Sequence, residues 1–458
     1  MKILILGAGQ VGSSVAEHLS REETNEVTVV DTRPNVLREL QDRLDIRTVV
    51  GHAAHPEVLK RAGAGDVNIV VALTDTDETN MIACQIAYTL FKTTTKIARI
   101  RSAEYMRTEK LFAPDAIPID FRISPEQLVC EYIEQLILYP GTSQVLDFAD
   151  GRVRLVGARA DRDGLLVGQR IATLKEHIPN TEARIAAIYR DGKAILPEGD
   201  TVIQEGDEVF FIADRKDIRV FMSEMRRLED PVRRVVIAGG GNIGVRLALA
   251  LEHTNQVKII ERDPKRARHI SEQLNKAIVL VGDAADEDLL LEENIDNVDV
   301  FCGLTNSEEA NILSSMLAKR LGAHKVMALI NRASYVDLVE AGSIDIAISP
   351  QQITIGSLLA HVRRGDVVKV HSLRRGAAEA IEAIAHGEKE NSNVVGRAIE
   401  DIKLPKGAAI VALVRKDKVI IAHHDTVIES GDHVILFLTD RRKVEDLEKL
   451  FQVDVSFV

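Results

Sequence analysis

The chain has 458 residues, a formal net charge of −12 and 45% hydrophobic residues, a balance typical of a globular protein with about two to four domains. The acidic charge and the low aromatic content, 4% with no tryptophan, argue against a surface that binds nucleic acid through basic contacts and base stacking. The sequence contains no run of about 18 apolar residues, and it opens on a strand rather than a signal peptide. We therefore expect a cytoplasmic protein that reaches a membrane only through a partner.

An apolar strand and a glycine-rich turn open the chain in "ILILGAGQVG" (residues 3–12). In the pattern Gly-x-Gly-x-x-Gly, the first glycine permits a sharp turn, the second lets a pyrophosphate approach the backbone, and the third lets the helix pack on the strand. A diphosphate at this turn meets the positive end of the helix dipole. The predicted nucleotide-binding residues are Gly7, Gly9 and Gly12, with Ala8, Gln10 and Val11 between them.

The second strand ends in an acid. "VTVVD" closes with Asp31, 19 residues beyond the third glycine, close to the spacing of about 20 in dinucleotide-binding folds. A carboxylate there accepts both ribose hydroxyls of an adenosine and repels a 2′-phosphate, which favours NAD over NADP. The alternative is a solvated acid at a strand end, without a ligand.

Strands and amphipathic helices alternate over about the first 120 residues. This order predicts an α/β domain with a doubly wound parallel sheet and right-handed crossovers, the Rossmann arrangement. The expected strands lie near residues 2–6, 27–30, 47–50, 67–73 and 96–100, with a sixth near 116–120.

The carboxyl ends of these strands should line a cleft. The fourth strand ends in "ALTDTDETN", so Thr74 and Asp75 are candidates to contact the nucleotide. Asp77 or Thr79 could instead simply cap the next helix, and both readings can hold together. Arg99, late on the fifth strand, is placed to meet a phosphate or a partner's carboxylate, with ordinary surface pairing as the alternative.

A helix and a small strand-rich module come after this domain. "SPEQLVCEYIEQLILYPG" predicts a helix capped by Ser124, with Pro125 at its first position. "RIAAIYRDGKAILP" predicts a hairpin with Asp191 and Gly192 at its tip. The module is too small to hold a substrate site with catalysis of its own. The charged stretch at residues 224–234 is the predicted linker to the second half of the chain.

The whole pattern then repeats. The opening motif corresponds to "VVIAGGGNIG" (residues 235–244). Later segments of the first half correspond, in order, to "QVKIIERDP", "AIVLVGDAADEDLLLE", "VFCGLTNSEEANILSS" and "DIAISPQQI". The offset stays between 225 and 232 positions, close to half of the chain's 458 residues. The chain is therefore two tandem copies of one unit.

The second copy repeats the candidate site. Glu261 stands 17 residues beyond the third glycine of its motif, and Ser307 is a possible helix cap beside the strand end. The predicted binding residues of this copy are Gly239, Gly240, Gly241, Asn242, Ile243, Gly244, Glu261, Thr305 and Asn306. Leu329 and Asn331 replace Arg99 and Arg101, and Asp283 answers His52, so we expect unequal sites.

The sequence predicts no metal site. Cys84, Cys130 and Cys302 lie far apart in apolar segments and match no metal-ligand spacing, which indicates buried thiols in a reducing cytoplasm. The "HHD" at residues 423–425 resembles a metal cluster only superficially, because its side chains alternate faces at a strand edge.

These motifs resemble the regulator-of-K⁺-conductance (RCK, or KTN) domain family. The order is Gly-x-Gly-x-x-Gly, a strand-end acid, "VGHA" or "VGDA", "LTxxxExN" and a small module with "EGDEVFFIA" in the first copy. Two such pairs without a membrane part resemble the TrkA family of Trk potassium uptake. The resemblance covers essentially the whole chain. It implies RCK N-terminal (Rossmann) domains at residues 1–123 and 232–349, and RCK C-terminal domains at residues 142–226 and 368–453.

The resemblance also implies function. It implies NAD(H) and ATP or ADP as ligands, with contacts at the residues named above, including Asp31, Thr74, Asp75 and Arg99. It implies a dimeric or tetrameric ring on the cytoplasmic face of the inner membrane, bound to a potassium-translocating subunit of the TrkH or TrkG type. Potassium comes from the resemblance alone. The nucleotide that activates is left open.

Three other functions are less compatible with the sequence. A dehydrogenase needs a substrate domain with an acid or base near the nicotinamide, and the duplication leaves no room for one. A nucleotide hydrolase would carry a Gly-x-x-x-x-Gly-Lys-Ser/Thr loop, which is absent. A redox-sensing transcriptional regulator would have a DNA-binding helix pair before the first strand and a less acidic chain. We therefore expect a protein that is not an enzyme.

Overall fold

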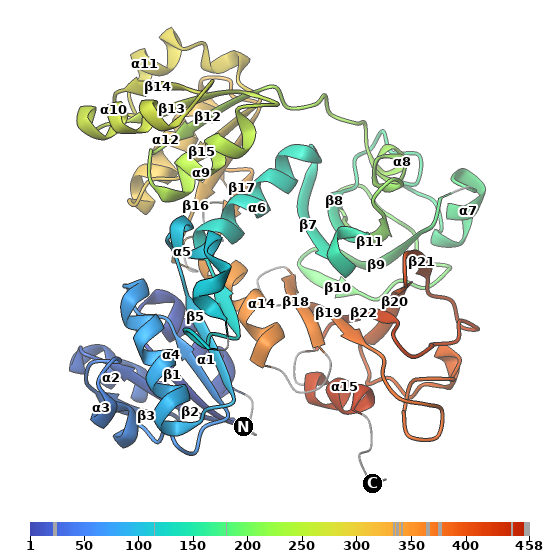
Figure 1. The fold of residues 1–458 in the computed structure, drawn as a ribbon. Helices are drawn as coiled ribbons and strands as arrows, with labels where there is room; N and C mark the ends of the chain where they lie inside the picture. The colour runs from blue at the N-terminus through green and yellow to red at the C-terminus, as the bar shows by residue number, and fades with distance from the viewer. Residues whose placement is uncertain are drawn as a thin grey trace. The chain divides into compact units, whose positions relative to one another are not determined.

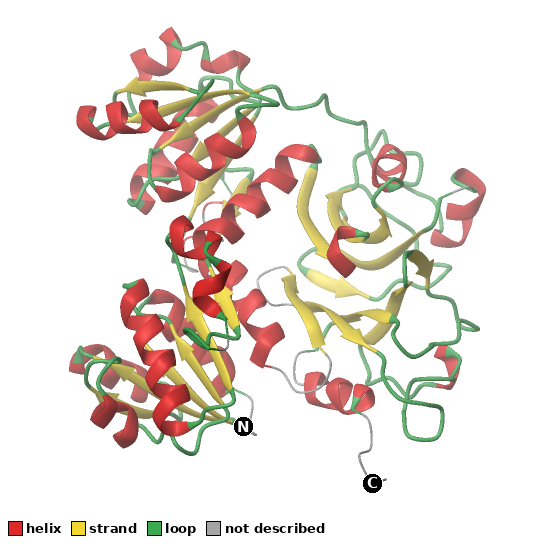
Figure 2. Ribbon diagram, in the orientation of Figure 1, coloured by secondary structure: helices red, strands yellow, loops and turns green. Residues whose placement is uncertain are grey.

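The computed structural model describes residues 1–21, 25–113, 115–179, 181–332, 335, 339, 342–362, 367–373, 378–440 and 443–452 (Figures 1 and 2). The described residues form two six-stranded parallel sheets and two five-stranded antiparallel sheets, which alternate along the chain. This confirms the predicted fold class, two tandem copies of a Rossmann-like domain followed by a small module. The predicted end of the last domain, residue 453, lies outside the described residues.

The first parallel sheet has the strand order β3-β2-β1-β4-β5-β6. The order reverses between β1 and β4, which is the point where open α/β sheets bind ligands at the carboxyl ends of their strands. The four residues from Ile3 to Leu6 are 0% exposed, as expected of a strand covered on both faces. The strands are β1 (Lys2–Leu6), β2 (Glu26–Asp31), β3 (Arg47–Val50), β4 (Ile69–Ala72), β5 (Thr95–Arg99) and β6 (Phe121–Ile123). The helices are α1 (Gln10–Ser20), α2 (Pro34–Gln41), α3 (Pro56–Arg61), α4 (Asp77–Phe91) and α5 (Ala103–Arg107).

The sixth strand begins later than predicted. It lies at Phe121–Ile123 and not at residues 116–120. The backbone N–H of Ile117 donates to Leu111 O at 3.0 Å, and that of Ile119 donates to Ile117 O at 2.9 Å. These bonds fold residues 117–119 back on their own loop, and bonding to β5 begins at Asp120, whose N–H donates to Lys96 O at 2.9 Å.

The second parallel sheet repeats the first, in the order β14-β13-β12-β15-β16-β17. Its last strand has the position that β6 has in the first sheet. The strands are β12 (Arg234–Ala238), β13 (Gln256–Glu261), β14 (Ile278–Val281), β15 (Val300–Gly303), β16 (Lys325–Leu329) and β17 (Ile346–Ile348). The helices include α9 (Asn242–Leu251), α10 (Pro264–Gln273), α11 (Glu287–Glu292) and α12 (Glu308–Arg320).

The two small modules share one strand order, β10-β9-β11-β8-β7 in the first and the equivalent β21-β20-β22-β19-β18 in the second. The predicted hairpin is confirmed: Asp191 and Gly192 join β9 to β10 with φ values of 50° and 77°, the geometry of a tight hairpin turn. The first module contains β7 (Thr142–Phe148), β8 (Val153–Arg159), β9 (Ala183–Arg190), β10 (Lys193–Ile195), β11 (Glu208–Asp214), α7 (Leu174–His177) and α8 (Ile218–Met225). The second contains β18 (Val367–Leu373), β19 (Ala378–Ile384), β20 (Ala408–Arg415), β21 (Lys418–Ile421), β22 (His433–Leu438) and α15 (Val444–Phe451).

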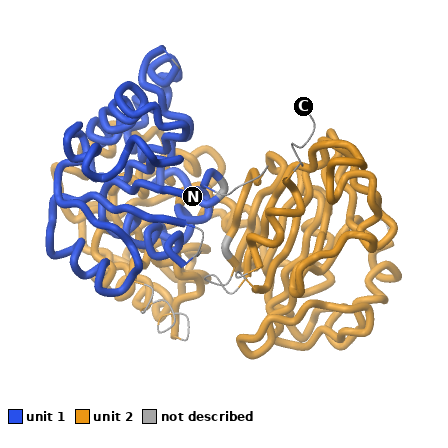
Figure 3. Tube along the Cα trace, turned by 90° about the horizontal axis from the view of Figure 1, so that it is seen from below, with its two compact units in different colours: residues 1–128, 349–362 blue, residues 129–348, 363–458 orange. Residues whose placement is uncertain are grey.

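The helices that follow the two Rossmann domains are exchanged between the copies. The chain divides into two compact units, residues 1–128 with 349–362, and residues 129–348 with 363–458 (Figure 3). The helix α14 (Pro350–Val362) of the second copy therefore belongs with the first Rossmann domain. It contacts α1 and β6, where Ser14 Oγ lies 3.4 Å from Gln351 Oε1 and the rings of Phe121 and His361 stack at 3.8 Å.

The reciprocal contact lies in the other unit. The helix α6 (Pro125–Leu138) belongs from Val129 onward to the unit of the second Rossmann domain. There the thiol of Cys130 donates to the carbonyl of Ile243, in the first turn of α9, at 3.4 Å. Each linking helix therefore contacts the glycine-loop helix of the opposite copy.

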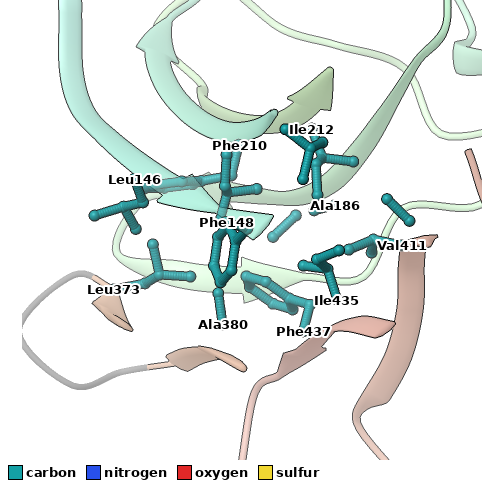
Figure 4. Close-up of a cluster of buried hydrophobic side chains, with 14 of the residues drawn as sticks. Leu146, Phe148, Ala186, Phe210, Ile212, Leu373, Ala380, Val411, Ile435 and Phe437 are labelled. Carbon is teal, nitrogen blue, oxygen red and sulfur yellow. The ribbon is translucent and has the colours of Figure 1, made fainter. Parts of the chain in front are cut away.

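The two small modules pack through one shared apolar cluster (Figure 4). Phe148 and Phe210 of the first module and Phe437 of the second are 0% exposed. Further members on the two sheets include Leu146, Ala186, Ile212, Leu373, Ala380, Val411 and Ile435. Glu382 of the second module accepts a hydrogen bond from the N–H of Ala149 at 2.9 Å, which adds a polar contact between the two modules.

A single carboxylate closes the loop after α10. Glu252, 2% exposed at the end of α9, accepts hydrogen bonds from the backbone N–H groups of Asn275, Lys276 and Ala277 at 3.0, 2.8 and 3.1 Å. Burial opposes the ionisation of Glu252, but these hydrogen bonds outweigh it and lower its pKa to about 2.

We expect Glu252→Gln to destabilise the chain by about 1–3 kcal/mol at pH 7, because it turns an NH₂ donor toward N–H groups that need an acceptor. The stability that ionised Glu252 contributes is fully present above its pKa in the unfolded chain, about 4.3. It is lost as the pH falls through its pKa in the folded chain, about 2. Urea unfolding at pH 7, 5 and 3 measures it. Glu272→Gln, at a side chain that is 64% exposed, is the control. A pH-independent difference would contradict the role of the charge.

Candidate functional site

Two of the three glycines of the first motif are required by packing. Gly7 has φ +103°, and a Cβ there would lie 2.9 Å from the O atom of Leu73, the residue that follows β4. A Cβ on Gly12 would lie 1.9 Å from Gly7 O, so only glycine lets α1 start this close to the turn. Gly239 and Gly244 repeat both constraints in the second copy, with the corresponding Cβ at 2.9 and 2.0 Å from its nearest neighbour.

The middle glycine is different. Within the described structure, a Cβ on Gly9 would meet no atom within 4 Å, and its φ of −73° suits any residue. The same holds for Gly241, with φ −71°. Folding alone does not require glycine at these two positions, and the space in front of them is open where the motif predicts the approach of a diphosphate.

The helices behind these turns begin without side-chain caps. Among the described residues, no side chain accepts a hydrogen bond at the start of α1 or α9, where Gly9 and Gly241 stand at the cap position. Helices α10, α11 and α12 of the second copy are capped by Asp263, Asp286 and Ser307, whereas α2, α3 and α4 of the first copy also lack a side-chain cap. The first-turn N–H groups of α1 and α9, next to Gln10, Val11, Asn242 and Ile243, thus combine with the helix dipole to favour an anion.

Asp31 lies behind the first glycine turn. It is 9% exposed, and its carboxylate accepts from the N–H of Ala8 at 2.7 Å and from Arg33 Nε at 3.0 Å. Burial raises the pKa of Asp31, but the hydrogen bonds from Arg33 and Ala8 outweigh burial and hold the pKa below its usual value. The ionised carboxylate thus orients the loop. Arg33 supplies three of its four hydrogen bonds, so a ribose hydroxyl would take the place of a bond from Arg33.

Glu261 has the same position in the second copy. It accepts from the N–H of Gly240 and of Asp263, both at 2.9 Å. The arginine beside it comes from a different position: Arg266, on α10, donates to Gly240 O at 2.8 Å. Arg33 NH2 lies 3.3 Å from the matching carbonyl of Ala8. The two copies therefore bring a guanidinium to one place from different residues, which sequence comparison of the copies did not indicate.

The end of the fourth strand is tied to the fifth by an asparagine. Asn80, 0% exposed, accepts from the N–H and the hydroxyl of Thr74 at 2.9 and 2.7 Å and donates to Arg99 O at 3.0 Å. Asn311 holds Thr305 and Leu329 O in the same way. Asn80 and Asn311 stand at matched positions of the repeat, in "TN" and "AN". That match was a signal for their role, and the sequence interpretation missed it.

The candidates beside these threonines are open to solvent. Asp75 and Asn306 are exposed at the carboxyl edge of their sheets. The amide and hydroxyl donors of Thr74 and Thr305 already have partners, and the hydroxyl oxygen of Thr305 also accepts from the N–H of Ser307 at 3.2 Å.

One capping prediction was wrong and two are confirmed. Ser124 caps α6, where its Oγ accepts from the N–H of Gln127 at 3.4 Å. Helix α4 begins at Asp77, so the residue at its cap is Thr76 and neither Asp77 nor Thr79. The carboxylate of Asp77 instead accepts the backbone N–H groups of Arg101 and Ser102 at 3.0 and 2.8 Å, because the chain after β5 returns over the helix end. Ser307 caps α12 as predicted.

Arg99 lies at the carboxyl end of β5 in a partly buried ion cluster. Its NH2 lies 3.4 Å from Glu126 Oε1, which also accepts from Arg101 Nε at 2.9 Å. The side chains of Arg99 and Glu126 are 18% and 9% exposed. Burial lowers the pKa of Arg99, and the charge of Glu126 only partly opposes this. Leu329, Asn331 and Gln351 occupy the matching positions of the second copy, so that copy lacks the cluster.

His52 replaces Asp283 in a loop of the same shape. The N–H of Ala54 donates to His52 Nδ1 at 3.2 Å, and that of Ala285 donates to Asp283 Oδ1 at 2.9 Å. The difference between His52 and Asp283 changes the side-chain charge at the carboxyl edge of the sheet, while the backbone hydrogen bond of the loop is the same in both copies.

In each copy, the structure brings the predicted residues to the carboxyl ends of neighbouring strands. In the first copy these strands are β1, β2, β4 and β5, and in the second they are β12, β13 and β15. Their contact with a ligand stays a prediction. The sequence interpretation did not include Arg33, Asn80 and Glu126, or Arg266 and Asn311.

The structure bears on three other expectations. All three cysteines are buried and form no disulfide, as predicted, and burial raises the pKa of Cys84 and Cys302 to about 12. Within the described part of the chain, no three His, Cys, Asp or Glu side chains are grouped to hold a metal. No helix built from the described residues is long and apolar enough to span a membrane.

Family models match both copies of the repeat. A model described as the TrkA-N domain matches residues 3–120 and 235–350, and one described as the TrkA-C domain matches residues 155–226 and 388–452.

Curated relatives match over the full length. The chain is 61% identical over 457 residues to the Trk system potassium uptake protein TrkA of Halomonas elongata, and 57% identical over 459 residues to that of Vibrio alginolyticus. Both alignments cover 100% of each chain.

Solved structures match in fold. The GsuK RCK domain aligns with a TM-score of 0.63 at 17% identity, over 98% of this chain and 94% of its own. A GsuK channel bound to NAD aligns with a TM-score of 0.61 at 17% identity, over 98% of this chain and 78% of its own.

Proposed function

Because the chain belongs to the TrkA family of Trk-system potassium uptake proteins, we propose that it is a nucleotide-sensing regulatory subunit and not an enzyme. It binds NAD(H), and ATP or ADP, in its two Rossmann domains. It acts at the cytoplasmic face of the inner membrane, as a dimeric or tetrameric ring, and gates a potassium-translocating subunit of the TrkH or TrkG type.

The open space at Gly9 and Gly241 carries this proposal. A glycine that packing does not require, at the uncapped start of a helix and in front of a buried carboxylate, fits a ligand with a diphosphate and a ribose. The NAD-bound GsuK channel, which shares this fold, supports the same ligand class.

Gating requires no chemistry on the ligand. A nucleotide that binds one arrangement of the subunits better than another shifts the population toward it. A tenfold shift requires a difference in binding of about 1.4 kcal/mol, which one charge-assisted hydrogen bond made in a single state supplies. The exchanged helices α6 and α14 offer a physical path, because each contacts a glycine-loop helix.

We expect Asp31→Asn and Glu261→Gln to weaken nucleotide binding at their own clefts by about 10-fold or more. Each substitution removes one charge-assisted acceptor for the ribose and keeps an oxygen for the loop amide. Calorimetry with NADH and ATP measures the loss. Glu39→Gln, exposed on α2, is the control. Unchanged affinities in the double variant would contradict the assignment of both clefts.

The partner is tested by co-purification with candidate membrane transporters, with and without NADH or ATP. We expect capture of a potassium-translocating subunit and nucleotide-dependent flux that the double variant abolishes. Capture of no transporter, or flux that ignores the chain, would contradict the regulatory role.

A further inference from the structure

A cavity of about 580 Å³ opens at the amino edge of the second parallel sheet. Arg234, Gln256 and Ile278, the first residues of β12, β13 and β14, all line it. The glycine turn and Glu261 lie at the opposite edge, where these parallel strands end. The cavity is therefore separate from the proposed nucleotide cleft, and its volume falls in the range of sites that bind small molecules.

Three neighbouring strands form one side of the cavity. Val236, Lys258 and Ile278 are partners in the register, so their side chains share one face of the sheet. Asn294 and Val298, from the segment that follows α11, also line the cavity. Ile278 is apolar but 55% exposed, because the described residues leave it uncovered on this face. The cavity thus offers an open apolar side chain at its outer strand.

A long side chain reaches across the corresponding place in the first copy. Arg47 begins β3 with the register that Ile278 has in β14. The guanidinium of Arg47 donates to Arg61 O, and one of its nitrogens would lie 3.7 Å from a Cβ on Gly63. Arg47 therefore spans from the edge strand to the loop after α3. Ile278 is too short to make the same span, so the second copy keeps a hollow that the first copy bridges.

The cations that line the cavity exceed the carboxylates, and both carboxylates already have partners. Glu252 accepts from the backbone N–H groups after α10, and Glu293 Oε2 accepts from Lys258 Nζ at 2.7 Å. Arg234 and Lys276 are exposed. Arg234 donates to a backbone carbonyl, and the Lys276 ammonium has no partner in the described part of the chain. An anion inside the cavity would therefore meet two cations that no carboxylate neutralises.

Other acids stand beside the lining residues in the sequence without lining the cavity. They are Glu292, Asp296 and Asp299. Asp299 accepts from the backbone N–H groups of Arg233 and Arg234 at 2.7 and 2.8 Å, which holds its carboxylate against the backbone. These acids reduce the attraction of an anion at long range, but the side chains within reach of a bound ligand are those of Arg234 and Lys276.

We propose that this cavity binds a small amphipathic anion, with its apolar body against Ile278 and its carboxylate or phosphate toward Lys276 and Arg234. Ammonium and guanidinium donors suit either anion, and an apolar body covers surface that is otherwise in water. A fully polar ion would leave Ile278 exposed, and an uncharged molecule would leave Lys276 without a partner. The site does not depend on the nucleotide binding proposed above.

The test uses a fluorescent anion on the full chain. Anilinonaphthalene sulfonate has an aromatic body whose emission rises in an apolar site, and its sulfonate represents the anion. It is titrated with NAD⁺ and ATP present in excess, to keep it out of the nucleotide clefts. Phenylnaphthylamine, which has a similar aromatic body without the charge, is titrated in parallel. We expect saturable binding of the anion, about 10-fold tighter or more than that of the uncharged probe.

The first copy supplies the matched substitution. Lys258→Thr together with Ile278→Arg gives the second copy the residues of the first, and the new arginine fills the hollow beside Glu293. We expect the anion to bind about 10-fold more weakly or worse in this variant. Lys276→Gln, at an exposed side chain, should weaken the anion and spare the uncharged probe, and it serves if the double variant does not fold. Leu291→Arg, at a side chain that is 51% exposed and does not line the cavity, is the control with the same added charge.

Each outcome decides the proposal. Absence of saturable binding, or binding that survives in both cavity variants, overturns the site. Displacement of the anion by NAD⁺ or ATP places it in the nucleotide clefts and also overturns the site. Equal affinity for the charged and uncharged probes overturns the choice of an anion. Competition by naphthoate and by naphthyl phosphate distinguishes a carboxylate from a phosphate ligand, and failure of both competitors contradicts the proposed ligand class.

Discussion

Replacing Gly9 with valine is expected to weaken nucleotide binding at the first cleft by more than about 100-fold with little change in stability. The valine side chain fits the folded chain, because no described atom lies within 4 Å of its Cβ position and φ is −73°. It occupies the space that a diphosphate needs to reach the loop N–H groups. Loss of two charge-assisted hydrogen bonds, about 1.5–3 kcal/mol each, accounts for this magnitude. Calorimetry and thermal melting measure the two effects, and a valine at the cap position costs at most about 1 kcal/mol.

Gly12→Ala is the matched control, with the opposite expected result. Its Cβ would lie 1.9 Å from Gly7 O, so α1 must shift and stability falls by about 1–3 kcal/mol or more. Gly241→Val and Gly244→Ala form the same pair in the second copy. Undiminished nucleotide binding by the Gly9 variant would place the ligand away from this loop.

Phe437→Ala is expected to cost about 3–5 kcal/mol and to loosen the first small module although the residue belongs to the second. Phe437 is 0% exposed in the cluster that both modules share, beside Phe148 and Phe210 (Figure 4). Its removal leaves a cavity that faces both sheets. Hydrogen exchange of β8 and β11 amides in the first module measures the effect across the contact.

Phe451→Ala is the control for this effect. Phe451 is 3% exposed in the second module and is not a member of the shared cluster. We expect faster exchange in the second module and unchanged exchange in β8 and β11. Equal exchange in the two variants would mean that the cluster does not couple the modules.

Local chemistry made much of this protein predictable. The apolar strands, the glycine turns and the repeat at half the chain length predicted two doubly wound sheets, and the strand order confirms them. The steric roles of Gly7 and Gly12 follow from the motif alone, because a strand that turns sharply into a helix leaves no room for a Cβ. Acids at strand ends share one sheet edge, because parallel strands all end on the same side.

The two copies have similar sequence patterns, so the contacts between distant segments could be seen only in the tertiary structure. Both linking helices have similar patterns, so nothing local could tell that α14 contacts α1 of the first copy. The same holds for the apolar sheet faces that meet at Phe437, since a buried face does not specify its partner. The pairing of Arg99 with Glu126, and the use of Arg33 in one copy and Arg266 in the other, depend on long side chains whose reach is set by packing. Periodicity and sterics act over a few residues, whereas these contacts join segments far apart in the chain, and only the folded backbone brings them within bonding distance.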